Sequence, residues 1–104
     1  MATELVTAGV TFGAGHYCSG ASIPASKVYE KAGLVQISPA SSHPRFTDDG
    51  GWNVIRATPR DDAQGTAAAR LIAEKFPKAT IAILSDQSPA SAALVTKLRE
   101  GLTA

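Results

Sequence analysis

The stretch VTFGAGHYCSGASIPASKVYEKAGLVQI, residues 10–37, decides the fold class. Residues 10–14 are a short apolar run with β-branched side chains, which predicts a buried strand. A helix is expected over residues 23–32, with Ser22 as its N-cap and Pro24 in its first turn. Residues 34–37 then form a second short apolar strand. A strand, a helix and a strand in this order favour two parallel strands joined by a helical crossover.

The same alternation continues on both sides of this stretch. The strongest strand candidate is TIAIL, residues 80–84, and either Asp61 or Asp62 is expected to cap the long helix before it. Trp52 is expected to pack at the start of another strand. Further elements are predicted as helices at residues 3–8, 45–47, 61–76 and 91–100, and as a strand at residues 52–57. The sequence therefore predicts an α/β fold, a parallel Rossmann-like sheet with helical crossovers on both faces.

Composition and charge exclude several classes of function. Ten Lys and Arg residues against nine Asp and Glu residues give a net charge of +1, and the two signs are interspersed. Nucleic-acid binding needs a clustered basic face, so no nucleic-acid partner is expected. No apolar run reaches the roughly 18 residues of a membrane-spanning helix. Residues 1–8 do not resemble a secretory signal, so either the protein stays in the cytoplasm or these residues are not its natural N-terminus.

Catalytic and metal-binding motifs are weak. Cys18 is the single cysteine, and together with His16 and His43 it matches no closed zinc motif, so no metal or cofactor is expected. An enzyme with Cys18 or Ser19 as nucleophile is the least favoured hypothesis for the function, because no recognised base and orienting acid accompany these residues. Residues 13–15 begin a dinucleotide fingerprint, but Cys18 stands where its third glycine belongs.

Two serine-bearing loops follow the first two predicted strands, at residues 15–22 and 38–42. Ligands of parallel α/β sheets bind beyond the carboxyl ends of the strands. The first loop leads into a helix N-terminus, which favours a carboxylate, and carbonyls of the second loop could accept from an ammonium group. The loops therefore predict a site for a zwitterion such as a free amino acid. The simpler interpretation is two ordinary turns with local serine caps.

The loops and their surroundings resemble the leucine/isoleucine/valine-binding proteins. The similar segments are residues 15–26, 33–42, 46–47, 54–57, 60–65 and 81–84, together with Asp86. The resemblance implies a type I periplasmic-binding fold, in which two α/β lobes close on an amino acid. The full-length family member is periplasmic and hands the amino acid to an ABC transporter permease. The chain looks like an internal fragment of such a non-enzymatic receptor.

The resemblance also implies the ligand-binding residues. In the family pattern, Ser19 and Ser42 bind the carboxylate of the ligand, and Ala40 and Ser42 help to hold its ammonium group. Ser41 lies between them in the same loop and completes the predicted ligand-binding set.

The family pattern divides the chain into parts of two lobes. Residues 1–57 belong to the first lobe, residues 58–60 are the hinge crossover, and residues 61–104 begin the second lobe. The ligand is expected to be a leucine-, isoleucine- or valine-like amino acid. The alternative hypothesis is a ligand-sensing or regulatory module of the same fold.

Departures from the family pattern make the predicted site incomplete. Residues 89–91 read Pro-Ala-Ser where the family usually has a tyrosine that covers the ligand. The acidic partner of the ammonium group falls beyond Ala104, and Cys18 lacks the earlier cysteine with which it often pairs. We therefore expect the 104 residues to bind amino acids weakly or not at all, and to self-associate through exposed strand edges.

Overall fold

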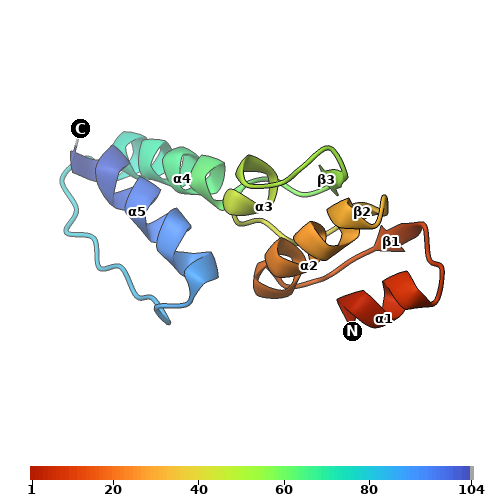
Figure 1. Cartoon of the computed structure of the whole chain (residues 1–104). Helices are drawn as coiled ribbons and strands as arrows, with labels where there is room; N and C mark the ends of the chain where they lie inside the picture. Colours follow the sequence, from red (N-terminus) through yellow and green to blue (C-terminus); the bar gives the residue numbers. More distant parts are fainter. Residues whose placement is uncertain (104) are drawn as a thin grey trace. The chain divides into compact units, whose positions relative to one another are not determined.

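The computed structural model describes residues 1–103, which form two compact units (Figure 1). The first is Met1–Thr58, and the second begins at Pro59. The first unit contains three helices and three strands, in the order α1 (Ala2–Thr7), β1 (Phe12–Ala14), α2 (Ser19–Lys31), β2 (Val35–Ser38), α3 (Arg45–Asp48) and β3 (Val54–Arg56). The second unit contains α4 (Asp61–Lys75) and α5 (Pro89–Thr103). The assignment of residues 1–57 and 61–104 to two lobes, with a hinge at 58–60, stays a prediction.

The first unit is built on a three-stranded parallel sheet in the order β1-β2-β3. Gly13 pairs with Gln36, and Ile37 pairs with Ile55. This confirms the predicted α/β class with parallel strands. Helices α2 and α3 follow β1 and β2, and they contact each other as well as the sheet. Two successive right-handed crossovers in one direction put their helices on the same face of the sheet, rather than on both faces as expected.

The two faces of the sheet differ in their polarity and in their exposure to solvent. Gln36 and Ser38, which share one face of β2, are completely buried. Phe12 and Ile55 lie on the opposite face, where their exposed fractions are 53% and 49%. In the first unit, the polar face of the sheet is therefore the covered one. The apolar core beside α2 consists of Ala25, Tyr29 and Leu34, with Ala2, Val6 and Val10 packed against it.

Helix α2 begins earlier than the sequence indicated. Its first residue is Ser19 and its N-cap is Cys18, so the prediction of Ser22 as N-cap is wrong. Pro24 suggested the later start because proline favours the first turn of a helix. Instead, Pro24 lies inside the helix, and the buried Ser22 hydroxyl makes contacts with distant residues. The predicted end is confirmed, because Gly33 follows the helix with a φ of +72°, which glycine adopts without strain.

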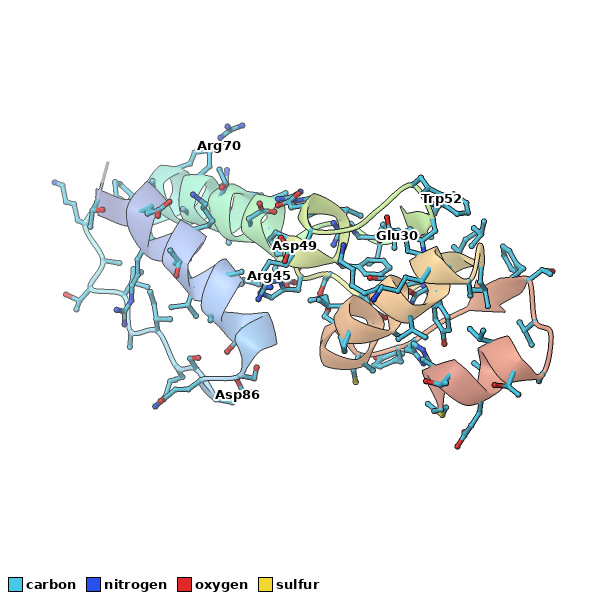
Figure 2. The ribbon with its side chains drawn as sticks, in the orientation of Figure 1. Glu30, Arg45, Asp49, Trp52, Arg70 and Asp86 are labelled. Carbon is cyan, nitrogen blue, oxygen red and sulfur yellow. The ribbon has the colours of Figure 1, made fainter. Side chains whose placement is uncertain are left out.

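The exposed residues of the first unit include Trp52. Its exposed fraction is 66%, and Figure 2 shows its side chain pointing outward, so the prediction of a packing role is wrong. Instead, its neighbour Asn53 is completely buried. The Asn53 side chain donates hydrogen bonds to the carbonyls of Ser26 and Leu34, at 3.1 and 3.2 Å. A buried amide thus joins β3 to α2 and β2.

The second unit is a pair of closely packed helices. A Cβ atom added at Gly65 of α4 would lie 2.5 Å from the Leu94 carbonyl oxygen in α5. One added at Gly101 of α5 would lie 2.5 Å from the Cβ atom of Ala69. The two helices therefore approach each other over residues without side chains or with small ones. Among the helices of residues 1–103, none is long and apolar enough to cross a membrane.

Two predictions for the second unit are wrong. The N-cap of α4 is Arg60 rather than Asp61 or Asp62, and Asp62 accepts a hydrogen bond from the Ala63 amide inside the first turn. Residues 80–84 form no strand. A strand needs a neighbouring strand to satisfy its backbone groups, whereas a helix satisfies them within itself. The described part of the second unit offers these five residues no such neighbour.

Candidate functional site

The loop after β1 is fixed to the end of β2 through one backbone carbonyl. The carbonyl oxygen of His16 lies within hydrogen-bonding distance of three serine hydroxyls, at 3.2 Å for Ser22, 2.7 Å for Ser38 and 3.2 Å for Ser41. All three serines are buried. The Ser22 and Ser41 hydroxyls are also 2.6 Å apart. The two serine-bearing loops, at residues 15–22 and 38–42, therefore lie side by side beyond the carboxyl ends of neighbouring parallel strands, as predicted.

The side chain of His16 adds a second connection between the first loop and α2. Its Nε2 atom is 2.9 Å from the hydroxyl of Tyr29, and the two rings stack with their centroids 5.9 Å apart. Burial raises the pKa of Tyr29 above its ordinary value, so its hydroxyl stays protonated near neutral pH. The contact fixes the first loop against the apolar core.

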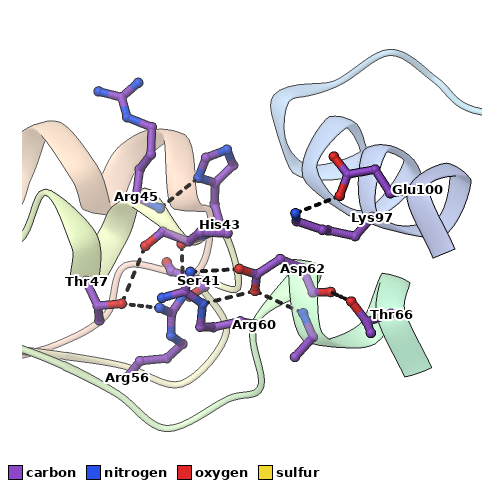
Figure 3. A network of polar contacts seen from close by, with 12 residues as sticks. Ser41, His43, Arg45, Thr47, Arg56, Arg60, Asp62, Thr66, Lys97 and Glu100 are labelled. Carbon is purple, nitrogen blue, oxygen red and sulfur yellow. Dashed lines mark hydrogen bonds and ion pairs between the residues drawn. The ribbon is translucent and has the colours of Figure 1, made fainter. Parts of the chain in front are cut away.

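Arg56, at the end of β3, holds the second loop from the other side (Figure 3). Its guanidinium donates to the carbonyls of Ser41 and His43, at 3.1 and 2.8 Å, and to the hydroxyl of Thr47. The guanidinium also lies 6.0 Å from the ring centre of Phe46. Each of the three parallel strands thus ends at the same site, which is what the carboxyl edge of a parallel sheet provides.

The predicted ligand-binding residues occupy two kinds of position. Ser19, Ala40 and Ser42 are half-buried, so part of each faces solvent. Ser41 is completely buried, and its hydroxyl contacts Ser22 and the carbonyls of His16 and Tyr17. The structure therefore brings all four residues together, but it leaves only three of them accessible to a solute.

Ser19 and Ser42 have hydroxyl groups with unused hydrogen-bonding capacity. The Ser19 Oγ atom accepts a hydrogen bond of 3.2 Å from the His43 amide, which leaves the hydroxyl proton available. The Ser42 hydroxyl makes no hydrogen bond with any residue among 1–103. Ser19 is also the first residue of α2, where backbone N–H groups have no partner within the helix. Donors therefore converge at this point from both loops.

His16, Ser22 and Ser38 lie in the two predicted loops, but their supporting roles were not predicted, and Arg56 was not predicted to take part in the site. Ser22 was interpreted as a helix cap, which its position before residues 23–32 suggested. Arg56 could have been found from its place at the end of a strand, because a cation there reaches the loops of neighbouring strands. The hydrogen bonds to the His16 carbonyl have no sequence pattern from which to infer them.

No metal centre occurs among residues 1–103, because no three His, Cys, Asp or Glu side chains converge there. Cys18 is exposed and its thiol is free. His16 and His43, the candidate bases, are engaged elsewhere: His16 contacts Tyr29, and the His43 Nδ1 atom accepts from the Arg45 amide at 3.1 Å.

Comparison with known proteins identifies binding proteins. The Leu/Ile/Val-binding protein homolog 1 of Brucella abortus is 39% identical over 102 residues, and the Leu/Ile/Val-binding protein of Escherichia coli is 35% identical over 102 residues. These alignments cover 98% of this chain but only 28% of each relative. The chain therefore spans less than a third of the length of these relatives.

Solved structures give the same result. A substrate-binding protein of an ABC transporter from Desulfitobacterium hafniense, in complex with Leu, matches with a TM-score of 0.75 and 33% identity, covering 96% of this chain and 31% of that one. A branched-chain amino acid transporter substrate-binding protein from Streptococcus pneumoniae, in complex with isoleucine, also has a TM-score of 0.75, at 25% identity over 96% of this chain and 29% of that one. These proteins are described by what they bind, in agreement with the expectation of a binding protein rather than an enzyme. Residues 1–102 match the family described as the receptor family ligand binding region, and the chain belongs to this family.

Proposed function

We propose that the chain is a piece of the solute-binding component of an ABC transporter for leucine, isoleucine, valine or a related amino acid. One observation carries the proposal: the hydroxyls of Ser19 and Ser42 keep unused hydrogen-bonding capacity where two loops meet beyond parallel strands. The relatives that bind Leu, Ile and Val support the ligand class.

The carboxylate of the solute would bind at the start of α2. The Ser19 hydroxyl already accepts from the His43 amide, so its own proton remains to donate to a further acceptor. Unpaired N–H groups and the positive end of the helix dipole favour a negative charge at the same place. A carboxylate meets these donors better than a neutral group does, because charged hydrogen bonds are roughly twice as strong.

The ammonium group of the solute would bind at the second loop. Ala40 and Ser42 are half-buried and flank the buried Ser41, so we assign their carbonyls and the Ser42 hydroxyl as acceptors for the ammonium group. Ser41 itself has a hydroxyl that is fully engaged with the first loop. We therefore assign Ser41 to positioning Ala40 and Ser42, and not to direct contact with the solute.

The two-lobe arrangement belongs to this proposal. Residues 1–57 would be part of the first lobe, residues 58–60 the hinge, and residues 61–104 the start of the second lobe. Two lobes of a binding protein close on one ligand and share its contacts. Because this chain spans only 28% of its relatives, we expect its binding to be weak, with a dissociation constant roughly in the millimolar range.

A titration with three serine variants tests the site. Leucine added to the ¹⁵N-labelled chain should shift the amide signals of residues 15–22 and 38–43, and glycerol at the same concentration should not. Ser42→Ala should remove these shifts without changing stability, because its hydroxyl has no partner in the described chain. Ser41→Ala should lower the free energy of unfolding by about 1–3 kcal/mol, because its partners are buried. Shifts that persist in both Ser19→Ala and Ser42→Ala, or no shift in a folded chain, would contradict the proposal.

The periplasm is the proposed location of the full-length protein, and a membrane permease is its proposed partner. A sensing or regulatory module is the second candidate, because the matched family is described as a receptor region. The neighbouring coding sequence separates these candidates. A secretory signal supports transport, whereas a DNA-binding or membrane-spanning segment supports sensing.

A further inference from the structure

Three successive backbone amides of the second loop differ in their partners. The Ser41 amide donates to the Ser38 hydroxyl at 2.9 Å. The His43 amide donates to the Ser19 hydroxyl at 3.2 Å. The amide of Ser42, between them, makes no hydrogen bond with any residue among 1–103. Ser42 therefore offers an N–H donor as well as its hydroxyl, at a half-buried position in the candidate site.

The carbonyls on either side of Ser42 are held by one side chain (Figure 3). The Nη1 atom of Arg56 donates to the Ser41 carbonyl at 3.1 Å and to the His43 carbonyl at 2.8 Å. Arg56 is the last residue of β3, so these contacts tie the second loop to the end of the neighbouring strand. A single guanidinium thus fixes the backbone before and after Ser42.

The guanidinium is in turn held by α3. It donates to the Thr47 hydroxyl, and it lies 6.0 Å from the ring centre of Phe46, which is completely buried. A planar guanidinium presents several donors in a fixed geometry, whereas the ammonium group of a lysine is a flexible point charge. Arg56 can therefore keep both carbonyls of the loop in place at once.

The contact with the Ser41 carbonyl also acts on the Ser42 amide, because the two groups belong to the same peptide unit. A cationic donor on the carbonyl polarises this unit and strengthens its N–H as a donor. The His43 carbonyl has no such counterpart, since the next residue is Pro44, which has no amide hydrogen. The polarising effect of Arg56 therefore falls on the one amide of residues 41–43 that has no partner within residues 1–103.

We propose that Arg56 is a positioning residue of the solute site, which fixes the second loop and strengthens the Ser42 amide as a donor to the carboxylate of an amino acid. This role of Arg56 rests on the proposed function, in which the solute lies between the two serine-bearing loops. Arg56 acts through the loop, and the residues that touch the solute remain Ser19, Ala40 and Ser42.

Chemical shifts test this role in the chain without solute. The ¹³C signal of the Ser41 carbonyl and the ¹⁵N signal of the Ser42 amide both respond to a hydrogen bond at that carbonyl. Arg56→Lys should move both signals, because an ammonium group does not reproduce the paired contacts of the guanidinium. The matched control is Arg45→Lys, because Arg45 is exposed and pairs with Asp49, so both signals should stay in place. Unchanged signals in Arg56→Lys would overturn the role of Arg56, whether or not a solute binds.

Titrations with leucine and leucinamide measure the effect on binding. Arg56→Lys should weaken the binding of leucine about tenfold, as loss of a supporting hydrogen-bond partner does at other sites. Arg45→Lys should bind leucine as the unchanged chain does. The loss should be smaller for leucinamide, because its neutral amide group gains less from a polarised donor than a carboxylate does. Equal losses for the two solutes would show a purely structural role and contradict the polarisation of the Ser42 amide.

Thr47→Val is a second variant, in which Arg56 itself is kept. Valine has nearly the shape of threonine but accepts nothing from the guanidinium, so the binding of leucine should weaken about threefold. Dispersed amide signals establish that each variant is folded. Full affinity for leucine in both Arg56→Lys and Thr47→Val would overturn the role of Arg56 and leave the proposed function standing. Failure of the proposed function differs, because the unchanged chain would then show no shift with leucine.

Discussion

The two units of this chain differ in the secondary structure that they form. Both contain helices of similar length, α2 with 13 residues in the first unit and α4 and α5 with 15 each in the second. Among the described residues, only the first unit forms strands, and there each strand has a neighbour. A helix pairs its backbone groups within about four residues of sequence, whereas a strand depends on a partner that is distant in the chain. Within the described residues, helices therefore form in both units, whereas the strand candidate at residues 80–84 has no neighbouring strand there and stays irregular.

The two units also differ in how their elements are held together. The first buries large side chains, including Tyr29, Leu34 and Phe46, each at most 2% exposed. In the second, Ala69 is the one buried apolar residue in the described part, while Leu71 and Phe76 stay more than half exposed. The second unit instead relies on close approach of helix backbones at Gly65 and Gly101. We therefore expect substitutions that remove side-chain volume to destabilise the first unit, and substitutions that add side-chain volume to destabilise the second.

The largest effect is expected from Phe46→Ala in the first unit. The Phe46 ring is completely buried, and its removal leaves a cavity that should lower the free energy of unfolding by about 3–5 kcal/mol. The matched control is Phe12→Ala in the same unit. Because Phe12 is 53% exposed, its replacement should cost less than about 1 kcal/mol. Chemical denaturation followed by circular dichroism measures both, and equal costs would show that burial does not determine the stability of this unit.

Much of the first unit could be predicted from the sequence because its determinants are local. Glycine at position 33 ends α2, and the apolar runs at residues 10–14 and 34–37 become parallel strands. The predicted start of α2 was wrong because Ser22 suits an N-cap and Pro24 suits the first turn of a helix. In the structure, the Ser22 hydroxyl contacts that of the distant Ser41 instead of capping a helix. The strand at residues 80–84 was wrong for a related reason, since propensity cannot reveal whether a partner is present.

The candidate site was predictable in position but not in its internal roles. Loops after parallel strands gather at one edge of the sheet, so residues 15–22 and 38–42 were expected to meet. Which serine faces solvent depends on burial, and burial is a property of the folded chain. Ser41 and Ser42 are identical neighbours in sequence, yet the first is completely buried and the second is half-buried.

A smaller effect is expected from Gly65→Val in the second unit. The new Cβ atom would lie 2.5 Å from the Leu94 carbonyl oxygen and 3.1 Å from the Leu98 amide nitrogen, and backbone atoms cannot move aside without separating the helices. Overpacking of this kind should cost about 2–3 kcal/mol. Ala67→Val, at an exposed position of the same helix, controls for the helix propensity of valine. The midpoint of thermal unfolding, followed by circular dichroism, should fall in Gly65→Val but not in Ala67→Val. Equal midpoints in the two variants would contradict close contact between α4 and α5.

The smallest effect is expected from lowering the pH, and this effect again differs between the two units. The hydrogen bond from Arg60, at 2.7 Å in the second unit, is the main reason why the pKa of Asp62 is lowered to about 2, from an ordinary value of 3.8. Because folding lowers this pKa, the carboxylate stabilises the folded chain above pH 3.8, and the contribution is lost as the pH falls toward 2. The loss should be at most about 1 kcal/mol, since both side chains remain partly exposed to solvent. Asp62→Asn should remove this part of the pH dependence of the free energy of unfolding between about pH 5 and pH 2. The control is Asp49→Asn, which breaks the exposed ion pair with Arg45 in the first unit and should leave the pH dependence in place. If Asp62→Asn kept the full dependence, the ion pair with Arg60 would not be the source of this loss of stability in acid.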